Sequence, residues 1–173
     1  TMQIGLISAI PYLLGAVALV VNGRWSDRTG ERVWHTAGGA LLGGIGFIGA
    51  ALTTSVPILS VAFICLSAIG VYAYSGPYWA ITTTVDPRIA AVGLGIVNAV
   101  GNFGGFFGPY AIGFLKTSTG STTIGMYFLA ATLIITGLIV LSLRSSKTTN
   151  QAAKVADEQD ASDEVDAESH PIN

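Results

Sequence analysis

Charged residues are scarce in this chain. Asp, Glu, Lys and Arg make up 10% of its 173 residues, whereas a soluble domain carries about 25%. The few acidic residues are unevenly placed, because only Asp27, Glu31 and Asp86 precede position 144. The net charge of -2 therefore averages a nearly uncharged body with an acidic C-terminal segment. The body lacks the charge that a water-soluble surface needs, and we expect no nucleic-acid partner.

Cysteine and histidine are nearly absent as well. Cys65 is the single cysteine, so an intrachain disulfide is impossible. His35 and His170 are the two histidines, and no nucleophile–base pair, metal-ligand cluster or phosphate-binding loop accompanies them. We therefore expect neither an enzyme nor a bound cofactor or metal.

Long apolar runs dominate what is present. Each run lacks Asp, Glu, Lys, Arg and His and is long enough to cross a hydrocarbon core of about 30 Å as a helix. The five runs cover residues 3–22, 36–52, 57–79, 89–115 and 123–143. They are continuous rather than alternating, which excludes the strands of a membrane barrel. The fold class predicted for residues 1–144 is an all-α membrane protein with five transmembrane helices.

The distribution of basic residues predicts the orientation in the membrane. Cytoplasmic links carry an excess of Lys and Arg. Seven basic residues fall on one side of the predicted spans: Arg24, Arg28, Arg32, Arg88, Arg144, Lys147 and Lys154. Lys116 alone falls on the other side. We expect the polar segment 23–35 and the C-terminus to be cytoplasmic, and residues 145–173, which are polar and acidic, to form a disordered tail.

Small and polar residues inside the apolar runs are candidates for packing and for solute binding. The pairs Gly39/Gly43, Gly101/Gly105 and Gly104/Gly108 have the spacing that lets helices approach closely. Asn98 and Asn102 are four residues apart and share one helix face, where they could bond a neighbouring helix or line a wet cavity. Candidate cavity groups on other runs are Tyr12, Tyr74 and Ser75. Pro77 is expected to bend or break its helix, and Pro109 is expected to kink its helix.

The polar segment resembles a family motif. Residues 23–32 (GRWSDRTGER) resemble the G-x-x-x-D-R-x-G-R-R loop of major facilitator superfamily transporters, with Glu31 in place of a basic residue. One run precedes the motif and four follow it, so the chain looks like the last five helices of a twelve-helix transporter. Three further strings resemble the anion:cation symporter branch, which includes tartrate, phthalate and sugar-acid transporters: residues 6–13 (LISAIPYL), 75–80 (SGPYWA) and 98–110 (NAVGNFGGFFGPY).

The resemblance implies secondary active transport of a small organic anion with H+ across the plasma (inner) membrane, by alternating access. It implies a gating loop in which Asp27 braces a neighbouring helix end, with Arg28 and Arg32 as basic partners. Gly23 and Gly30 belong to the same loop motif. It places Asn98, Asn102, Tyr74 and Ser75 among the substrate groups.

The charged residues that such transport needs are not found in these five runs, and two alternative functions remain open. No run carries a charge, so we expect the anion-pairing Arg and the proton-carrying acid on helices upstream of Thr1. The alternatives are a transporter of another substrate class, such as a sugar or drug, and a non-transporting membrane assembly subunit.

Overall fold

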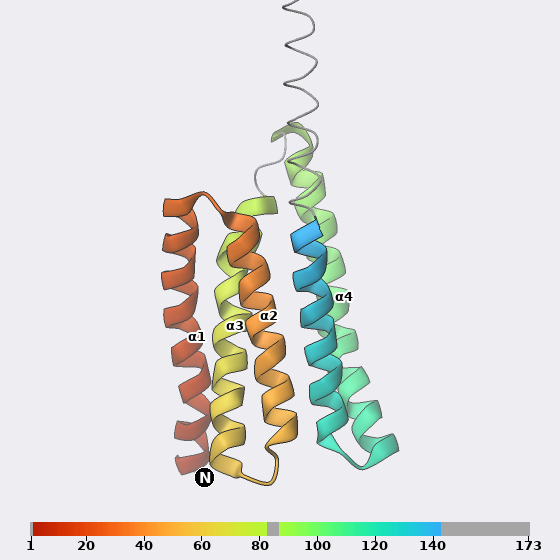
Figure 1. Cartoon of the computed structure of the whole chain (residues 1–173). Helices are drawn as coiled ribbons and strands as arrows, with labels where there is room; N and C mark the ends of the chain where they lie inside the picture. Colours follow the sequence, from red (N-terminus) through yellow and green to blue (C-terminus); the bar gives the residue numbers. More distant parts are fainter. Residues whose placement is uncertain (1, 83–86, 143–173) are drawn as a thin grey trace, which may run out of the picture.

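The computed structural model describes residues 2–82 and 87–142, and the tail predicted over 145–173 lies outside them. Five helices are long and apolar enough to cross a membrane, as the sequence predicts. They are α1 (Met2–Thr29), α2 (Arg32–Leu52), α3 (Pro57–Thr82), α4 (Pro87–Thr119) and a fifth helix, Thr122–Ser142 (Figure 1).

Helix ends coincide with recognisable signals. Gly30 directly follows α1 and Gly120 directly follows α4. Both glycines have a φ of 70°, the left-handed conformation that closes a helix and favours glycine. α3 and α4 each begin with a proline, which suits a first turn because no N–H is needed there. The fifth helix begins where Ser121 Oγ accepts a hydrogen bond from the backbone N–H of Thr123 at 3.2 Å.

The helices extend beyond the predicted spans. α1 continues seven residues past the predicted end at Asn22, and α2 starts four residues before Thr36. Helices also continue through Pro77 in α3 and Pro109 in α4, so neither proline breaks its helix. α4 has 33 residues, about 50 Å of helix at 1.5 Å per residue, which exceeds a single crossing.

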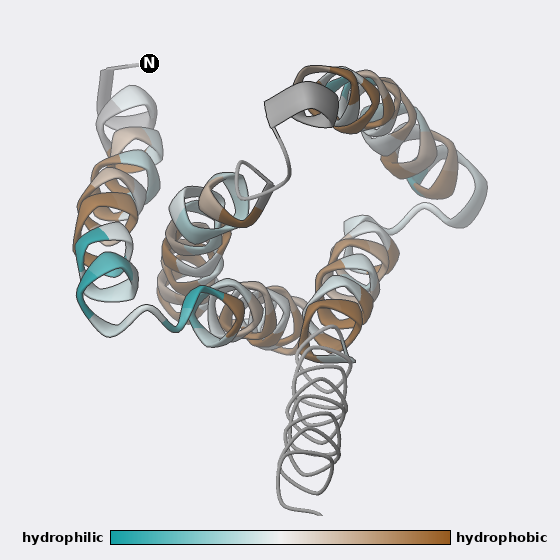
Figure 2. Ribbon diagram, turned by 90° about the horizontal axis from the view of Figure 1, so that it is seen from above, coloured by the Kyte–Doolittle hydropathy of each residue, from teal (hydrophilic) through white to brown (hydrophobic). Residues whose placement is uncertain are grey.

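The helices form a curved row when viewed along their axes (Figure 2). α3 lies between α1 and α2 and packs on both. The fifth helix packs on α2, where a Cβ added to Gly44 would lie 2.8 Å from Ile134 Cγ1. It also packs on α4 through Gly125, opposite Ile112. The order in space is therefore α1, α3, α2, fifth helix, α4.

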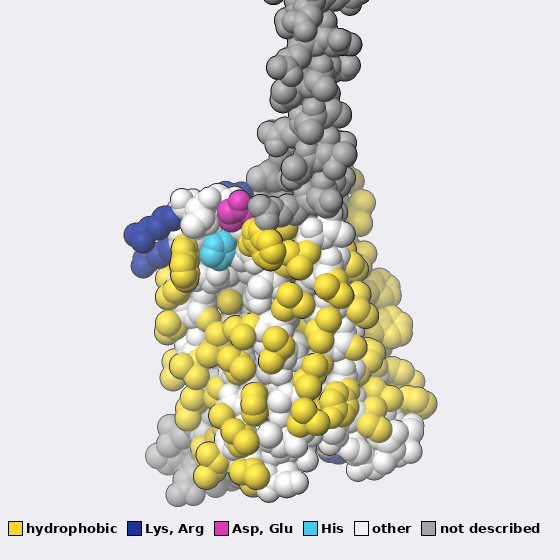
Figure 3. All heavy atoms as spheres, viewed as in Figure 1, with side chains coloured by type: hydrophobic (Ala, Val, Ile, Leu, Met, Phe, Trp, Pro, Cys, Tyr) yellow, Lys and Arg dark blue, Asp and Glu magenta, His cyan; other side chains and the backbone are white. Residues whose placement is uncertain are grey.

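The surface matches a lipid environment. Large apolar side chains such as Leu13, Ile58 and Phe106 are 67%, 85% and 71% exposed. Figure 3 shows hydrophobic side chains over the length of one face, with most of the visible charged side chains gathered at its upper end. Because exposed apolar surface on this scale is not stable in water, the chain is an integral membrane protein.

Candidate functional site

The predicted polar loop is mostly helix. Within residues 23–35, only Gly30 and Glu31 lie outside α1 and α2. The segment named as a gating loop is therefore a two-residue connection between the ends of two long helices. Charged residues indicate where a helix leaves the hydrocarbon core, but they do not end the helix. The first residue of this segment that ends a helix is Gly30.

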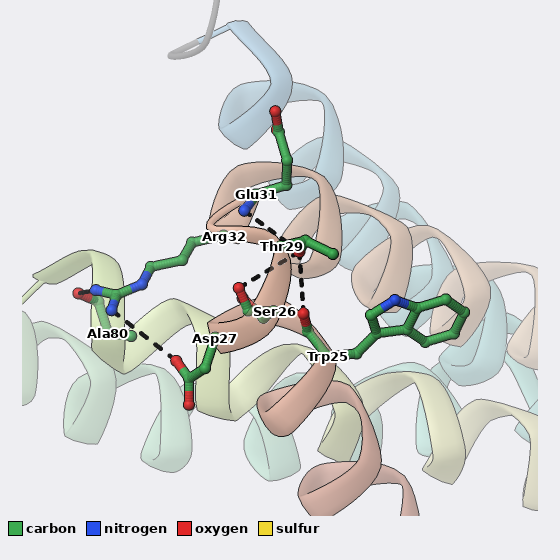
Figure 4. A network of polar contacts seen from close by, with 7 residues as sticks. All are labelled: Trp25, Ser26, Asp27, Thr29, Glu31, Arg32 and Ala80. Atoms are coloured by element: carbon green, nitrogen blue, oxygen red, sulfur yellow. Dashed lines mark hydrogen bonds and ion pairs between the residues drawn. The ribbon is translucent and has the colours of Figure 1, made fainter.

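Side chains of the last turn of α1 close the connection (Figure 4). The Thr29 hydroxyl donates to the carbonyl of Trp25 at 3.0 Å, and the Glu31 backbone N–H donates to Thr29 Oγ at 3.4 Å. The Gly30 N–H donates to the Ser26 carbonyl at 2.9 Å. These bonds satisfy backbone groups that a helix end leaves unpaired, so the turn is tightly held.

Arg32 ties this turn to the end of α3. Its Nη1 donates to the carbonyl of Ala80 at 2.9 Å, and its Nη2 lies 3.9 Å from Asp27 Oδ1 (Figure 4). A cation suits this position, because the carbonyls at a helix C-terminus carry partial negative charge. The Asp27 side chain is 67% exposed, so its ion pair with Arg32 contributes little stability.

The remaining gating-loop candidates lie on the same structure. Arg28 is exposed in the last turn of α1, and Gly23 lies on α1, where an added Cβ would meet no atom within 4 Å. The structure therefore places Gly23, Asp27, Arg28, Gly30 and Arg32 at one end of the α1–α2–α3 layer.

A hydrogen-bonded group beneath the turn escaped the sequence analysis. Asn22 Nδ2 donates to the Ala73 carbonyl on α3 at 2.7 Å, and His35 Nδ1 donates to Asn22 Oδ1 at 2.7 Å. His35 Nε2 lies 3.2 Å from Thr29 Oγ. These contacts join α1, α2 and α3. The available signal was the pair of polar residues that flank the charged stretch, each at the edge of an apolar run.

Three of the predicted cavity residues lie on α1 and α3. Tyr12 is 64% exposed and meets Tyr72 edge-on, with ring centroids 6.4 Å apart. Both tyrosines line a cavity of about 350 Å³ between α1, α2 and α3. Tyr74 packs edge-on against Tyr78 at 6.3 Å. The Ser75 hydroxyl donates to the Val71 carbonyl at 3.2 Å, so its hydrogen is already used within α3.

Sequence analysis missed Ser67, which lines the same cavity as Tyr12. The residue is 1% exposed, and its Oγ has no hydrogen-bond partner among the described residues. An unpaired buried hydroxyl is costly, so Ser67 is a further polar candidate beside this cavity. Its position beside Gly46 of α2 depends on tertiary packing that the sequence pattern does not show.

Asn98 and Asn102 lie apart from that cavity, on α4. Both are exposed, and Asn102 Nδ2 lies 3.4 Å from Asn98 Oδ1. Within the described residues, no hydrogen bond links this amide pair to the candidates on α1 or α3. The structure therefore leaves the predicted cavity groups in two sets, one on the α1–α3–α2 layer and one on α4. No cluster of three or more metal-ligating side chains occurs in the described part of the chain.

Comparison with known proteins identifies a family. The model of the Major Facilitator Superfamily matches residues 1–168. A protein of Agrobacterium vitis named "Putative tartrate transporter" is 40% identical over 83% of this chain and 32% of its own length. No solved structure matches the chain.

Two further relatives carry other names. The quinolone resistance transporter of Acinetobacter baumannii is 32% identical over 84% of this chain and 34% of its own length. The inner membrane transport protein RhmT of Escherichia coli is 34% identical over 84% of this chain and 34% of its own length. The chain thus spans about a third of the length of the curated relatives it matches.

Proposed function

Because the chain belongs to the Major Facilitator Superfamily, we propose that it supplies the last five helices of a twelve-helix secondary transporter. The transporter carries a small organic anion across the plasma (inner) membrane together with H+. The observation that carries the choice of substrate class is the 40% identity to the tartrate-named relative over 83% of the chain.

Neutral polar groups of this chain contact the substrate in this proposal. Asn98 and Asn102 present amides on the exposed face of α4, and Tyr12, Tyr74 and Ser75 present hydroxyls on α1 and α3. A carboxylate in a low-dielectric site also needs a cation. Since the five apolar runs contain none, the pairing Arg and the proton-carrying acid belong to helices of the complete polypeptide outside this chain.

Asp27 and Arg32 act at the gate in this proposal. Alternating access requires one end of the helix bundle to open and close. The exposed Asp27 carboxylate, held loosely at 3.9 Å from Arg32, is available to brace the N-terminus of a helix from the other half, where a negative charge is stabilised. Asp27→Asn should lower uptake by the complete polypeptide while its unfolding is unchanged. Wild-type uptake by this variant would remove the gate role.

The turn at Gly30 faces the cytoplasm in this proposal, as the count of basic residues favours. The same count places the segment 145–173 in the cytoplasm, where its composition favours a disordered acidic tail. Arg28→Cys tests the orientation, because an impermeant thiol reagent should label it in inside-out vesicles and not in right-side-out vesicles. Labelling of intact right-side-out vesicles would reverse the assignment.

The substrate test uses the complete polypeptide in proteoliposomes with an imposed pH gradient. We expect concentrative uptake of tartrate that collapses with a protonophore. The relative named for quinolone resistance makes drug export the second candidate, so fluoroquinolone accumulation is measured in the same vesicles. Drug export without anion uptake would favour that rival, and transport of neither solute nor sugars would favour the assembly subunit.

A further inference from the structure

A second groove lies on the opposite side of the α1–α3–α2 layer from the tyrosine-lined cavity. It has a volume of about 490 Å³, within the range of small-molecule sites. Its walls include Val17 and Val21 of α1 and Leu42 of α2, and its floor includes Ile69 and Ala73 of α3. We call it the outer groove.

Helix geometry separates the two sites. At 100° per residue, Ile69 and Ala73 point about 120–160° away from Ser67 and Val71, which line the tyrosine cavity. The outer groove therefore faces away from the proposed substrate groups on α1 and α3. An occupant of the groove is not the transported solute.

Small residues leave the groove unfilled. α1 and α2 make few direct contacts because α3 separates them, and Gly38 lies in the α2 wall of the groove. A Cβ added to Gly38 would meet no atom within 4 Å. The groove thus has room for an extended apolar chain between α1 and α2.

A basic cavity adjoins the groove at the end nearest the α1–α2 turn. This cavity, of about 470 Å³, is lined by Arg24, Arg28 and Thr29, and it shares Val21 and Trp25 with the outer groove. Figure 3 shows basic side chains projecting at this corner of the molecule. Within the described residues neither arginine has an ion-pair partner, since Asp27 pairs with Arg32.

Aromatic side chains mark the boundary between the two cavities. Trp25 and Trp34 both line the groove and are 61% and 50% exposed. Tryptophan prefers the headgroup level of a bilayer. The basic cavity therefore lies at the depth of lipid phosphates, and the apolar groove lies at the depth of acyl chains.

We propose that the outer groove and the basic cavity together bind one anionic phospholipid of the surrounding leaflet. An acyl chain lies between α1 and α2, and the headgroup phosphate lies between Arg24 and Arg28. The lipid holds α1 to α2 at a place where protein contacts are few. The proposal requires that the chain spans a membrane and that the outer groove faces lipid in the complete polypeptide, and it does not depend on the substrate.

The test measures lipid affinity of the complete polypeptide by native mass spectrometry. Phosphatidylglycerol and phosphatidylcholine with identical acyl chains are compared. A basic residue near an anionic headgroup favours binding about fivefold, so the wild type should prefer phosphatidylglycerol about 25-fold. Arg24→Gln should reduce the preference to about fivefold, and Arg24→Gln with Arg28→Gln should abolish it.

Three further variants separate charge, groove and fold. Gly38→Leu should fill the groove and weaken the binding of both lipids, whereas Arg24→Lys should keep the preference for phosphatidylglycerol. Lys116→Gln, at the opposite end of the bundle, should change nothing. The proposal is overturned if the double arginine variant retains the preference, if Gly38→Leu binds both lipids normally, or if glycerol phosphate without acyl chains displaces the lipid.

Discussion

Glycine occupies opposite environments in α2 and α4. A Cβ on Gly39 would lie 2.8 Å from the backbone nitrogen of Tyr74, and a Cβ on Gly70 of α3 would meet the backbone of Gly43. In α4, by contrast, no atom lies within 4 Å of a Cβ added to any of its glycines, including Gly101 and Gly104. Half of the most apolar stretch of α2 is buried, and none of that of α4 is buried.

The spacing of small residues therefore predicts that a helix can pack closely, but it does not predict which helix it packs on. The Gly39/Gly43 pair packs on α3 within this chain, as predicted. The Gly101/Gly105 and Gly104/Gly108 pairs have no such contact among the described residues. We propose that they pack on helices of the complete polypeptide.

The largest expected effect is at the α2–α3 contact. Gly70→Leu should lower the free energy of unfolding by about 3 kcal/mol, because the added side chain meets backbone atoms that cannot give way. Gly104→Leu should change it by less than about 0.5 kcal/mol in this chain. Detergent unfolding followed by helix content measures both. Equal tolerance at the two positions would remove the contrast, and destabilisation by Gly104→Leu in the complete polypeptide would indicate that α4 is covered there.

The amides of α4 should matter for transport instead of folding. Asn98→Ala removes a donor proposed to reach a charged substrate, which is worth about 1.5–3 kcal/mol. The KM for uptake should therefore rise roughly 10- to 150-fold, while the unfolding of the 173-residue chain is unchanged because Asn98 is exposed. A KM within twofold of the wild type would remove Asn98 from the substrate site.

A smaller loss of stability is expected at Asn22, the amide inside the packed layer. Asn22→Ala leaves the Ala73 carbonyl and His35 Nδ1 without partners and should cost about 1–2 kcal/mol. Its matched control, Asn102→Ala, loses one exposed bond of 3.4 Å and should cost less than about 0.5 kcal/mol. Equal costs in the unfolding assay would show that the Asn22 contacts do not join the helices.

The smallest effects are expected at the turn. Arg32→Gln should cost about 1 kcal/mol because the Ala80 carbonyl loses a charged donor. Asp27→Asn should cost less than about 0.5 kcal/mol because its carboxylate is exposed and distant from Arg32. If thermal unfolding instead ranks Asp27→Asn as the more damaging change, the ion pair contributes more than its geometry indicates.

Much of the fold was accessible from the sequence. Five uncharged runs predicted five helices, because an unpaired charge or backbone group is costly in lipid. The ends of the helices were less accessible. Arg24, Asp27 and Arg28 indicated an exit from hydrocarbon, but helix formation does not require lipid, and α1 continues to Thr29.

The candidate site was predicted in part. Residues that carry a motif or stand out as polar in an apolar run, such as Asp27 and Asn98, were found. Asn22 and Ser67 were missed because their environments depend on contacts with other helices, Asn22 with Ala73 of α3 and Ser67 with Gly46 of α2. A single sequence gives residue spacing along one helix but not the pairing between helices.

The two-residue connection at Gly30 has a mechanical consequence. The connection holds the ends of α1 and α2 close together. Nearby, Asn22 of α1 and Arg32 of α2 each form a hydrogen bond to α3. Displacement of α1 relative to α2 must therefore pivot at this end and grow with distance from it. Since α2 and α3 are packed together, the far end of α1, at Gly5, moves furthest relative to both.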